Sequence, residues 1–462
     1  MPTKYPYIPI SHEDQKAMLQ EMGLDSLEVL FADIPKEFRV KKSLDLPPSH
    51  SEISLRKHVQ TVALSNQTDA EMLSFLGGGV WSHHVPAVVD AIISRDEFLS
   101  AYTPYQPEVS QGSLQSLFEY QSLIGELFDL PIVNNSMYDW ATALGEAARM
   151  CQRITRKTEF LVPQTISPER RIVLETYTRP AGMKITDISY DPISGLLNLE
   201  DLSEKLSADV AGVYVENPTY LGYFEPQIPE IVDMAHNNKS LFVLGVDPTC
   251  LGIIRSPGDL GADIAVAEGQ PFGGHPNFGG HLLGIFAVRE DKKFIRQFPG
   301  RVIGATLTKS GERRGYVMTL QTREQHIRRE KATSNICTNH ALNAIGAAVY
   351  LSLLGKQGLY DLGKTLLENS HYLQNQLQTL PEVRVPRFTA SHFKEFVVDF
   401  GAINKPASQI LEDLLDHHVF GGIPLETAFP ELKNCVLVCT TEIHTKEDLD
   451  KYVTCLSEVL EE

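Results

Sequence analysis

Short apolar runs, bounded by polar or turn-forming residues, alternate with helix-like patterns from about residue 131 onward. The runs EFLVP, RIVLETY, AGVYVENP, LFVLGVD and LGIFAVR are predicted strands, and the segments NLEDLSEKL and PEIVDMAHNN are predicted helices. This alternation favours a mostly parallel sheet with helices on both faces. We therefore predict an α/β fold whose large domain spans residues 61–340.

The two ends of the chain follow other patterns. Residues 1–60 are predicted to be an N-terminal helical arm, because Ser11 marks the start of a short amphipathic helix and Gly23 its end. A polar, Pro-rich stretch follows, and such an arm cannot bury its own apolar face, so we expect it to dock on the body or on a partner. Residues 341–462 open with an Ala-rich helix and are predicted to form a C-terminal small α+β domain.

Polar side chains follow the apolar runs where a binding site is expected. Asp247 comes directly after the run 241–246, and Asn217 follows the preceding strand-like run. Because parallel strands end at a common edge, we expect both side chains at the carboxyl edge of the sheet, where ligands of such folds bind. Ser136 lies in the stretch NNSMYD before a predicted helix, whose free backbone N–H groups could hold a phosphate.

A second candidate region is the segment 102–112, YTPYQPEVSQG. Pro104 and Pro107 restrict its backbone, and loops held this stiffly are often functional. Its aromatic and polar side chains are Tyr102, Tyr105, Gln106, Glu108 and Gln111. This loop is more shaped than a mere connection requires.

Two further motifs keep more than one interpretation. The triple glycine 77–79 lets the backbone pass where side chains would not fit. His83 and His84 follow it and could be ligands, general bases or ordinary loop residues. A basic stretch in this acidic chain indicates a solvated surface, a subunit interface or an anion site. Its residues are Arg313, Arg314, Arg323, Arg328, Arg329 and Lys331.

Composition argues against several classes of function. The formal net charge of −18 over 462 residues argues against nucleic acid and anionic membrane surfaces as partners. No apolar run approaches the roughly 18 residues of a membrane helix, and no hydrophobic signal region opens the chain, so a cytoplasmic location is expected. The six cysteines form no Cys-x-x-Cys pair and are interpreted as buried thiols in a reducing compartment. No metal site is predicted.

Four phrases together resemble one protein family. They are FLGGGVWSHHVP, YTPYQPEVSQG, PGDLGADI and REKATSNICTN. In these phrases the chain is similar to the glycine decarboxylase P-protein of the glycine cleavage system, and the similarity covers essentially the whole chain. There is one departure: where the family often has an Asp between an aromatic residue and a histidine, this chain has Ser82.

The resemblance implies a large domain of the pyridoxal 5′-phosphate (PLP)-dependent, aminotransferase-like fold (fold type I). In that fold an Asp at the place of Asp247 pairs with the pyridine nitrogen, and a lysine on the loop after a following strand forms the Schiff base. No lysine lies between Lys239 and Lys292. The corresponding position falls near Gln270 and Pro271, and neither residue can form an imine. The resemblance thus implies that a partner subunit, rather than this chain, binds PLP covalently.

The length of the chain resembles that of subunit 1, the α subunit, in the two-subunit prokaryotic form of the family. This implies a subunit 2 (β) partner in an α2β2 assembly, which decarboxylates glycine as an oxidoreductase and passes the aminomethyl group to the lipoyl arm of H-protein. The loop 102–112 is then expected to complete the partner's pocket. Residues expected at the phosphate of the partner's PLP are Thr333, Ser334 and Asn335, with a helix N-cap as the alternative interpretation. A remnant pocket is expected at Ser136, Asn217 and Asp247.

Two other hypotheses remain open at this point. The chain could be a non-catalytic scaffold or regulatory subunit whose own pocket binds nothing. It could also be an autonomous PLP enzyme that uses another lysine, for which Lys309 is the candidate.

Overall fold

The computed structural model describes residues 9–42, 44–68 and 71–461, and the chain divides into two units, Met1–Gln67 and Thr68–Glu462. In the first unit, α1 (His12–Glu21) begins at Ser11, as predicted. The Ser11 hydroxyl accepts a hydrogen bond from the Asp14 N–H at 3.1 Å, and the Ser11 N–H donates to the Asp14 carboxylate at 2.8 Å. The unit continues with η1 (Leu27–Phe31), η2 (Lys36–Phe38) and α2 (Glu52–Ala63). Its described residues include no buried side chain, so it has no core of its own.

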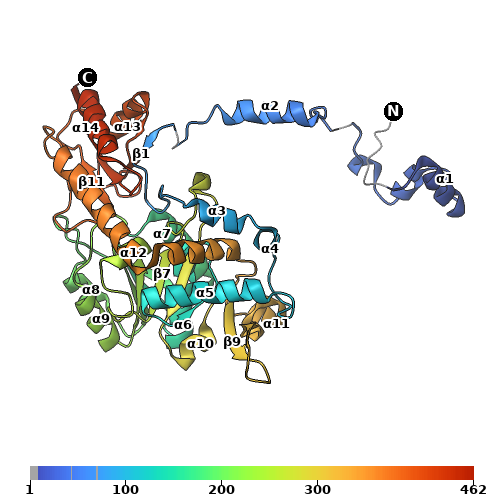
Figure 1. Ribbon diagram of the computed structural model, residues 1–462, viewed down its shortest axis with the longest axis horizontal. Helices are drawn as coiled ribbons and strands as arrows, with labels where there is room; N and C mark the ends of the chain where they lie inside the picture. Colours follow the sequence, from blue (N-terminus) through green and yellow to red (C-terminus); the bar gives the residue numbers. More distant parts are fainter. Residues whose placement is uncertain (1–8, 43, 69–70, 462) are drawn as a thin grey trace. The chain divides into compact units, whose positions relative to one another are not determined.

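A seven-stranded sheet forms the centre of the second unit (Figure 1). In spatial order its strands are β2 (Ile132–Val133), β8 (Gly284–Val288), β7 (Ile264–Glu268), β6 (Leu241–Val246), β5 (Val210–Glu216), β3 (Glu159–Pro163) and β4 (Lys184–Ile188). β8 pairs antiparallel with both of its neighbours, and the other pairs are parallel. The predicted mostly parallel sheet is confirmed.

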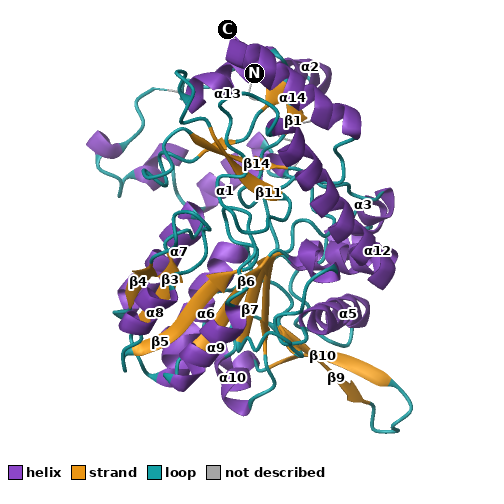
Figure 2. Ribbon diagram, turned by 90° about the vertical axis from the view of Figure 1, so that its left-hand side faces the viewer, coloured by secondary structure: helices purple, strands orange, loops and turns teal. Residues whose placement is uncertain are grey.

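Helices cover both faces of this sheet (Figure 2). Both faces need a cover because successive side chains of a buried strand point to opposite sides. Along β7, Ile264 and Val266 pack with the cluster that contains α6, whereas Ala265 and Ala267 pack with the cluster that contains α5 and α12. One face carries α6 (Trp140–Thr155), α7 (Pro168–Thr178) and α10 (Lys292–Gln297). The other carries α3 (Ala87–Ile93), α5 (Gln111–Phe128), α8 (Leu199–Lys205), α9 (Ile228–Asn237) and α12 (Ala341–Leu377).

Two segments differ from the sequence-based expectation. The predicted strand RIVLETY is wrong: it lies in α7, where Pro168 occupies the first turn. Its β-branched residues misled the prediction, because Ile172 is 65% exposed and only one side of the segment is buried, as in a surface helix. The polar stretch after residue 300 contains the antiparallel hairpin β9 (Val302–Leu307) and β10 (Arg314–Thr319), which projects from the body in Figure 2.

The C-terminal part begins with the predicted Ala-rich helix at Ala341, the start of α12, and α12 continues to Leu377 across a break at Gly355 (φ +62°). A three-stranded sheet follows in the order β11 (Glu395–Asp399), β14 (Cys435–Cys439) and β13 (Ile423–Pro424). Around it lie α13 (Ala407–Asp416), α14 (Lys446–Glu461) and the parallel pair β1 (Leu73–Ser74) and β12 (Val419–Phe420). The domain boundary at residue 340 stays a prediction.

Shorter elements complete the second unit. They are α4 (Asp96–Leu99), α11 (Gln325–Arg328), η3 (Arg179–Ala181), η4 (Pro248–Gly252), η5 (Asn277–Gly279), η6 (Gln321–Arg323) and η7 (Arg329–Lys331). Among the helices of the described residues, none has the length and apolar character needed to cross a membrane. The cysteines are free thiols, and all are buried except Cys337, which is exposed.

Candidate functional site

Asp247 lies at the carboxyl end of β6, as predicted, and a lysine from a distant part of the chain is its partner. The Lys394 ammonium, one residue before β11, lies 2.7 Å from the Asp247 carboxylate, and both side chains are almost fully buried. The Thr249 hydroxyl and N–H also donate to Asp247, at 2.7 and 3.0 Å. Burial alone would raise the pKa of Asp247, but the charge of Lys394 outweighs it and holds that pKa below its usual value.

The ammonium of Lys394 also donates a hydrogen bond to Nε2 of His83, at 3.0 Å. Because an ammonium can only donate, Nε2 accepts, which places the proton of a neutral His83 on Nδ1. From there it donates to the Glu442 carboxylate at 2.7 Å. Burial, together with the neighbouring charge of Lys394, lowers the pKa of His83 and favours the neutral ring. Burial opposes ionisation of Glu442, but the His83 hydrogen bond prevails and lowers the pKa of Glu442 to about 2.

Trp81 packs against Lys394 in the same network. The indole ring centre lies 3.9 Å from the Lys394 ammonium, a cation–π distance. Gln270 holds the Trp81 backbone on both sides, accepting from its N–H at 3.1 Å and donating to its carbonyl at 2.9 Å. Gln270 is the residue near the expected lysine position, so the segment 77–84 is fixed both at that position and, through Lys394, at Asp247.

The triple glycine allows the segment 77–84 to approach this closely. A Cβ on Gly77 would lie 2.3 Å from the Glu395 carboxylate and 2.7 Å from Cβ of Cys439. Gly78 has φ +75°, and its N–H donates to Glu395 at 2.6 Å. The prediction that side chains would not fit at the triple glycine is confirmed for Gly77.

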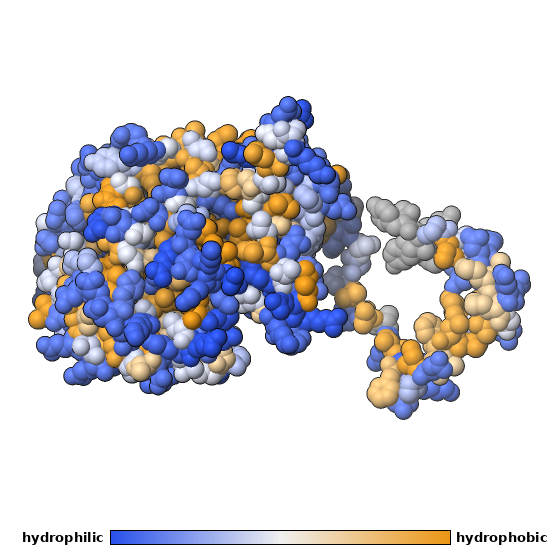
Figure 3. All heavy atoms as spheres, turned by 90° about the horizontal axis from the view of Figure 1, so that it is seen from below, coloured by the Kyte–Doolittle hydropathy of each residue, from blue (hydrophilic) through white to orange (hydrophobic). Residues whose placement is uncertain are grey.

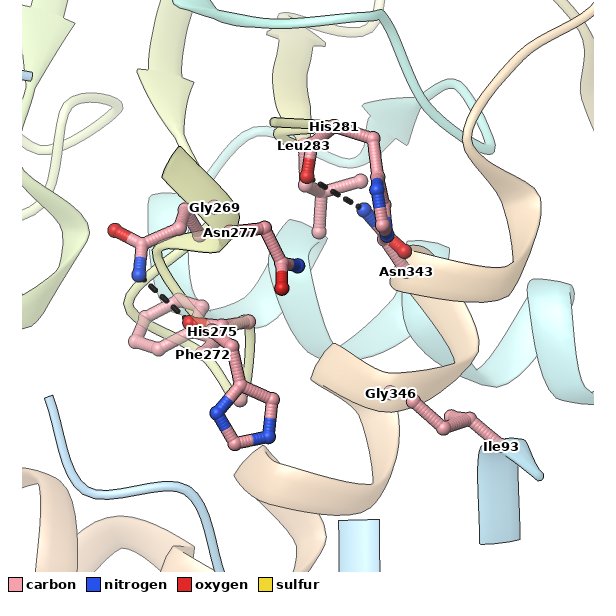
Figure 4. Close-up of a pocket in the computed structure, with 12 residues that line it drawn as sticks. Ile93, Gly269, Phe272, His275, Asn277, His281, Leu283, Asn343 and Gly346 are labelled. Carbon is pink, nitrogen blue, oxygen red and sulfur yellow. Dashed lines mark hydrogen bonds between the residues drawn. The ribbon is translucent and has the colours of Figure 1, made fainter. Parts of the chain in front are cut away.

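One cavity borders the segment 77–84, and a second is lined in part by Gln270, which binds the Trp81 backbone. A cavity of about 390 Å³ lies between Gly77–Val80, the start of α6 and Arg170. The other, of about 50 Å³, lies between the loop that follows β7 and α12 (Figure 4). There the Asn343 amide donates to the His281 carbonyl at 3.3 Å, which ties that loop to the helix. The second cavity has room for only a few water molecules.

Ser136 and Asn217, the other members of the expected remnant pocket, are also buried but take different parts. The Ser136 hydroxyl makes no hydrogen bond within the described chain. The Asn217 side chain accepts from the Glu225 N–H at 3.0 Å, and Asn217 precedes a cis bond to Pro218. Asn217 thus shapes its own loop, and neither side chain belongs to the Asp247–Lys394–His83–Glu442 network among the described contacts.

The candidate loop 102–112 is anchored by a residue that the sequence analysis did not single out. The guanidinium of Arg301, 4% exposed, donates to the Thr103 hydroxyl at 2.7 Å and to the Tyr105 hydroxyl at 3.0 Å. Gln111 binds both backbone groups of Tyr316, at 2.9 Å each, and so joins the loop to β10. Gln106 and Glu108 are exposed.

Tyr102 brings this loop to the other motif of the resemblance. It is 70% exposed, and its hydroxyl lies 2.9 Å from that of Thr338. A cavity of about 280 Å³ is lined by residues 101–104 on one side and by residues 338–343 and His281 on the other. Two sequence motifs more than 200 positions apart therefore share one open pocket.

Thr333, Ser334 and Asn335 line a separate cavity of about 370 Å³ together with Arg149, Arg153 and Arg329. The Ser334 hydroxyl donates to Glu146 at 2.6 Å, and burial raises the pKa of Glu146. Asn335 accepts from the Tyr177 hydroxyl at 3.3 Å. These residues do not cap the following helix, since α12 begins after His340. Three arginines around hydroxyl groups are a chemistry suited to an anion.

Other candidate residues lie away from this site. Lys309 is exposed in the turn of the β9–β10 hairpin. His84 is exposed, and its N–H donates to Glu442 at 2.7 Å. His417, at the end of α13, and Cys455 and Glu458 of α14 bring three potential ligand atoms within 4.8 Å of one another. Nothing in the chain's spacing pattern indicated this last cluster.

Comparison with known proteins gives consistent likenesses. Residues 5–456 match the family model described as glycine cleavage system P-protein. A protein of Thermococcus onnurineus (strain NA1), named probable glycine dehydrogenase (decarboxylating) subunit 1, is 50% identical over 98% of this chain and 99% of its own length. A protein of the same name from Desulfitobacterium hafniense (strain DSM 10664 / DCB-2) is 45% identical over 98% and 99%.

Solved structures agree. A crystal structure of glycine decarboxylase (P-protein) of the glycine cleavage system, in inhibitor-bound form, is 40% identical and superposes with a TM-score of 0.87 over 99% of this chain and 100% of that one. A NifS-like protein from Rickettsia africae, 13% identical, gives a TM-score of 0.63 over 85% of this chain and 100% of that one, a likeness of fold alone. The predicted fold type I class is confirmed.

Proposed function

Because the chain belongs to the glycine cleavage system P-protein family, we propose that it is one of two different subunits of a glycine-decarboxylating dehydrogenase. Its relatives of nearly equal length are named subunit 1, which implies a second subunit. In this proposal the second subunit (β) holds PLP covalently, the two assemble as α2β2, and the aminomethyl group passes to the lipoyl arm of H-protein. PLP supplies the electron sink for loss of CO2 from glycine.

The observation that carries the division of labour is the pairing of Asp247 with Lys394. The family fold needs a carboxylate for the cofactor's ring nitrogen and a lysine for its aldehyde. Here the carboxylate is already neutralised by Lys394 at 2.7 Å, and Gln270 near the expected lysine position holds the Trp81 backbone. This chain therefore does not offer the groups that would hold PLP.

What this chain contributes is proposed to lie on its outward-facing loops. Tyr102, Tyr105, Gln106, Glu108 and Gln111 belong to a loop that Arg301 and β10 hold in place, with Tyr102 mostly exposed. Such a loop can close over a site on a neighbouring chain and exclude water from it at little cost in ordering entropy. Thr333, Ser334 and Asn335, beside arginines, offer hydroxyl and amide groups to a phosphate of that neighbouring site.

The test is reconstitution with a companion chain that carries a lysine after the equivalent aspartate. In the presence of H-protein, we expect the assembled pair to exchange label between bicarbonate and the carboxyl group of glycine. Neither chain alone should do so. Borohydride reduction and peptide mapping should place the phosphopyridoxyl group on the companion chain. A stoichiometric label on Lys309, or on any lysine of this chain, would contradict the proposal. Full activity of the companion chain alone would instead assign this chain a scaffold role.

A further inference from the structure

We propose that Lys394 and Trp81 act as a built-in replacement for the cofactor's protonated pyridine ring, and that they close this chain's own fold-type-I site to PLP and its analogues. The inference rests on the family fold, but on no reaction of glycine. The ring nitrogen of PLP, when protonated, donates one charged hydrogen bond to an aspartate at the carboxyl end of a strand. In this chain the Lys394 ammonium makes such a bond to Asp247 at 2.7 Å.

The two residues correspond to the cofactor ring in aromatic character as well as in charge. A bound cofactor would bring an aromatic ring and a positive charge into the site together. This chain supplies them separately, as the indole of Trp81 and the ammonium of Lys394, 3.9 Å apart. The Trp81 side chain is 2% exposed, so the ring lies inside the protein, as a cofactor ring would.

Lys394 cannot serve as a Schiff-base lysine while it holds this position. The aldehyde carbon of PLP lies on the ring atom opposite the nitrogen, so a Schiff-base lysine approaches the end of the ring that is far from the aspartate. Lys394 contacts the aspartate itself and donates onward to His83 at 3.0 Å. Its ammonium is thus paired on two sides and covered on a third by Trp81.

The replacement also joins distant parts of the second unit. Asp247 follows β6 of the large sheet, Lys394 precedes β11 of the small sheet, and Trp81 and His83 come from the segment 77–84. Glu442 follows β14, and its carboxylate accepts hydrogen bonds from the His83 ring and from the His84 N–H, at 2.7 Å each. In place of an exchangeable cofactor, a permanent ion pair holds these elements together.

Binding of pyridoxamine 5′-phosphate tests the proposal. This probe has the same ring nitrogen and phosphate but no aldehyde, so it forms no imine with surface lysines. In a Trp81→Ala background, which frees the place of the ring, equilibrium dialysis on the full chain compares the otherwise wild-type protein, Lys394→Ala, Asp247→Asn/Lys394→Ala and, as a matched control, Lys309→Ala in the exposed hairpin turn. Only Lys394→Ala leaves Asp247 free to pair with the protonated ring nitrogen of the probe, so it should bind the probe about 10- to 100-fold more tightly than the other three, the range of one charged hydrogen bond.

Three results would overturn the proposal. The otherwise wild-type protein could bind the probe as tightly as Lys394→Ala, folded Lys394→Ala could gain no affinity, or the double variant could bind as tightly as the single one. If Lys394→Ala does not fold, acetylation of the native wild-type chain decides. Lys394 should then react at least about 100-fold more slowly than Lys309, as expected for a group that is exposed only by local unfolding, and equal rates would mean an open site. The proposed function is tested by different measurements, the exchange of label and the position of the phosphopyridoxyl group, so failure of one proposal can be told apart from failure of the other.

Discussion

The segment 77–84 and the loop 102–112 lie close in sequence, but the first is largely buried and the second is largely exposed. Both are shaped by glycine or proline, and both carry aromatic and polar side chains that resemble family motifs. The first is turned inward: Trp81 and His83 are 2% and 7% exposed, and His83 has charged partners on both sides of its ring. The second is turned outward, with Tyr102 70% exposed. Motif residues that are buried and paired serve this chain, whereas exposed ones on an anchored loop are available to a neighbour.

The N-terminal unit, like the loop 102–112, exposes apolar side chains. Its described residues are all at least partly exposed, including many large apolar ones, which appear as orange spheres on its surface in Figure 3. Examples are Phe38 at 77%, Val40 at 78% and Leu64 at 81%. Exposed apolar surface of this kind indicates an interaction site. The apolar residues of this unit are therefore expected to dock on the body or on a partner.

Breaking the buried ion pair should have the largest effect on the inward side. Lys394→Met leaves the Asp247 carboxylate buried without its counter-charge, so we expect the free energy of unfolding to fall by about 3–5 kcal/mol. Urea denaturation of the full chain measures this. The double variant Asp247→Asn/Lys394→Met removes both charges and should recover most of the loss. Equal destabilisation by the single and double variants would show that lost packing, rather than the unpaired charge, is responsible.

Acid should weaken the same network. The pKa of Glu442 is about 2 in the folded protein against an ordinary value of 4.5, and the pKa values of Asp247 and His83 are also lowered. The folded state therefore holds fewer protons than the unfolded one, so stability is lost as pH falls. The loss begins below the usual pKa of histidine, through His83, and continues between about pH 4.5 and 2, through Glu442. Glu442 alone should account for about 3 kcal/mol at the end of that range. In Glu442→Gln the pH profile of urea midpoints should be flatter; an unchanged slope would contradict the assignment.

The close approach at the triple glycine can be tested by adding one methyl group. Gly77→Ala would place its Cβ 2.3 Å from the Glu395 carboxylate, and overpacking of this kind costs about 1–3 kcal/mol. Gly112→Ala is the matched control from the outward loop, because a Cβ there meets no atom within 4 Å and lies in the first turn of α5. Differential calorimetry should show a lower melting temperature for Gly77→Ala only. A comparable drop in both variants would remove the distinction between the segments.

On the outward side, substitutions should affect activity rather than stability. In the reconstituted pair, Tyr105→Ala and Glu108→Ala are expected to lower glycine–bicarbonate exchange about 10- to 100-fold, the value of one charged hydrogen bond felt in the transition state. Tyr105→Phe keeps the ring and removes only the hydroxyl that Arg301 binds, which separates loop anchoring from contact with the partner's site. Rates are normalised to intact complex. Loss of complex with unchanged specific activity would make the loop a packing element.

The smallest effect on the isolated chain is expected in the N-terminal unit. Leu64→Ser changes a side chain that is 81% exposed, so the unfolding free energy should shift by less than about 0.5 kcal/mol. If this surface meets the partner, the same variant should weaken assembly, which analytical ultracentrifugation of the mixed subunits measures. Leu307→Ser in the hairpin, also exposed at 64%, is a control for general surface polarity. Identical assembly by both variants and wild type would exclude Leu64 from the interface.

The sequence by itself determined the elements whose signals are local. Ser11 defined the start of α1, and the apolar run before Asp247 correctly indicated a buried strand that ends at the ligand edge. The strand predicted at RIVLETY was wrong, since β-branched composition outweighed the start signal of Pro168. The motif phrases were sufficient to identify the family, because they are specific and are spread along the chain.

Only the tertiary structure decided which groups meet. Lys394 is 147 positions from Asp247 in the printed numbering, and Glu442 is 359 positions from His83, so no spacing rule could pair them. The absence of a lysine between residues 239 and 292 was visible in the sequence, but the lysine that fills the site from another sheet was not. Local patterns are set by neighbours along the chain, whereas a buried ion pair depends on how separate sheets and loops pack together.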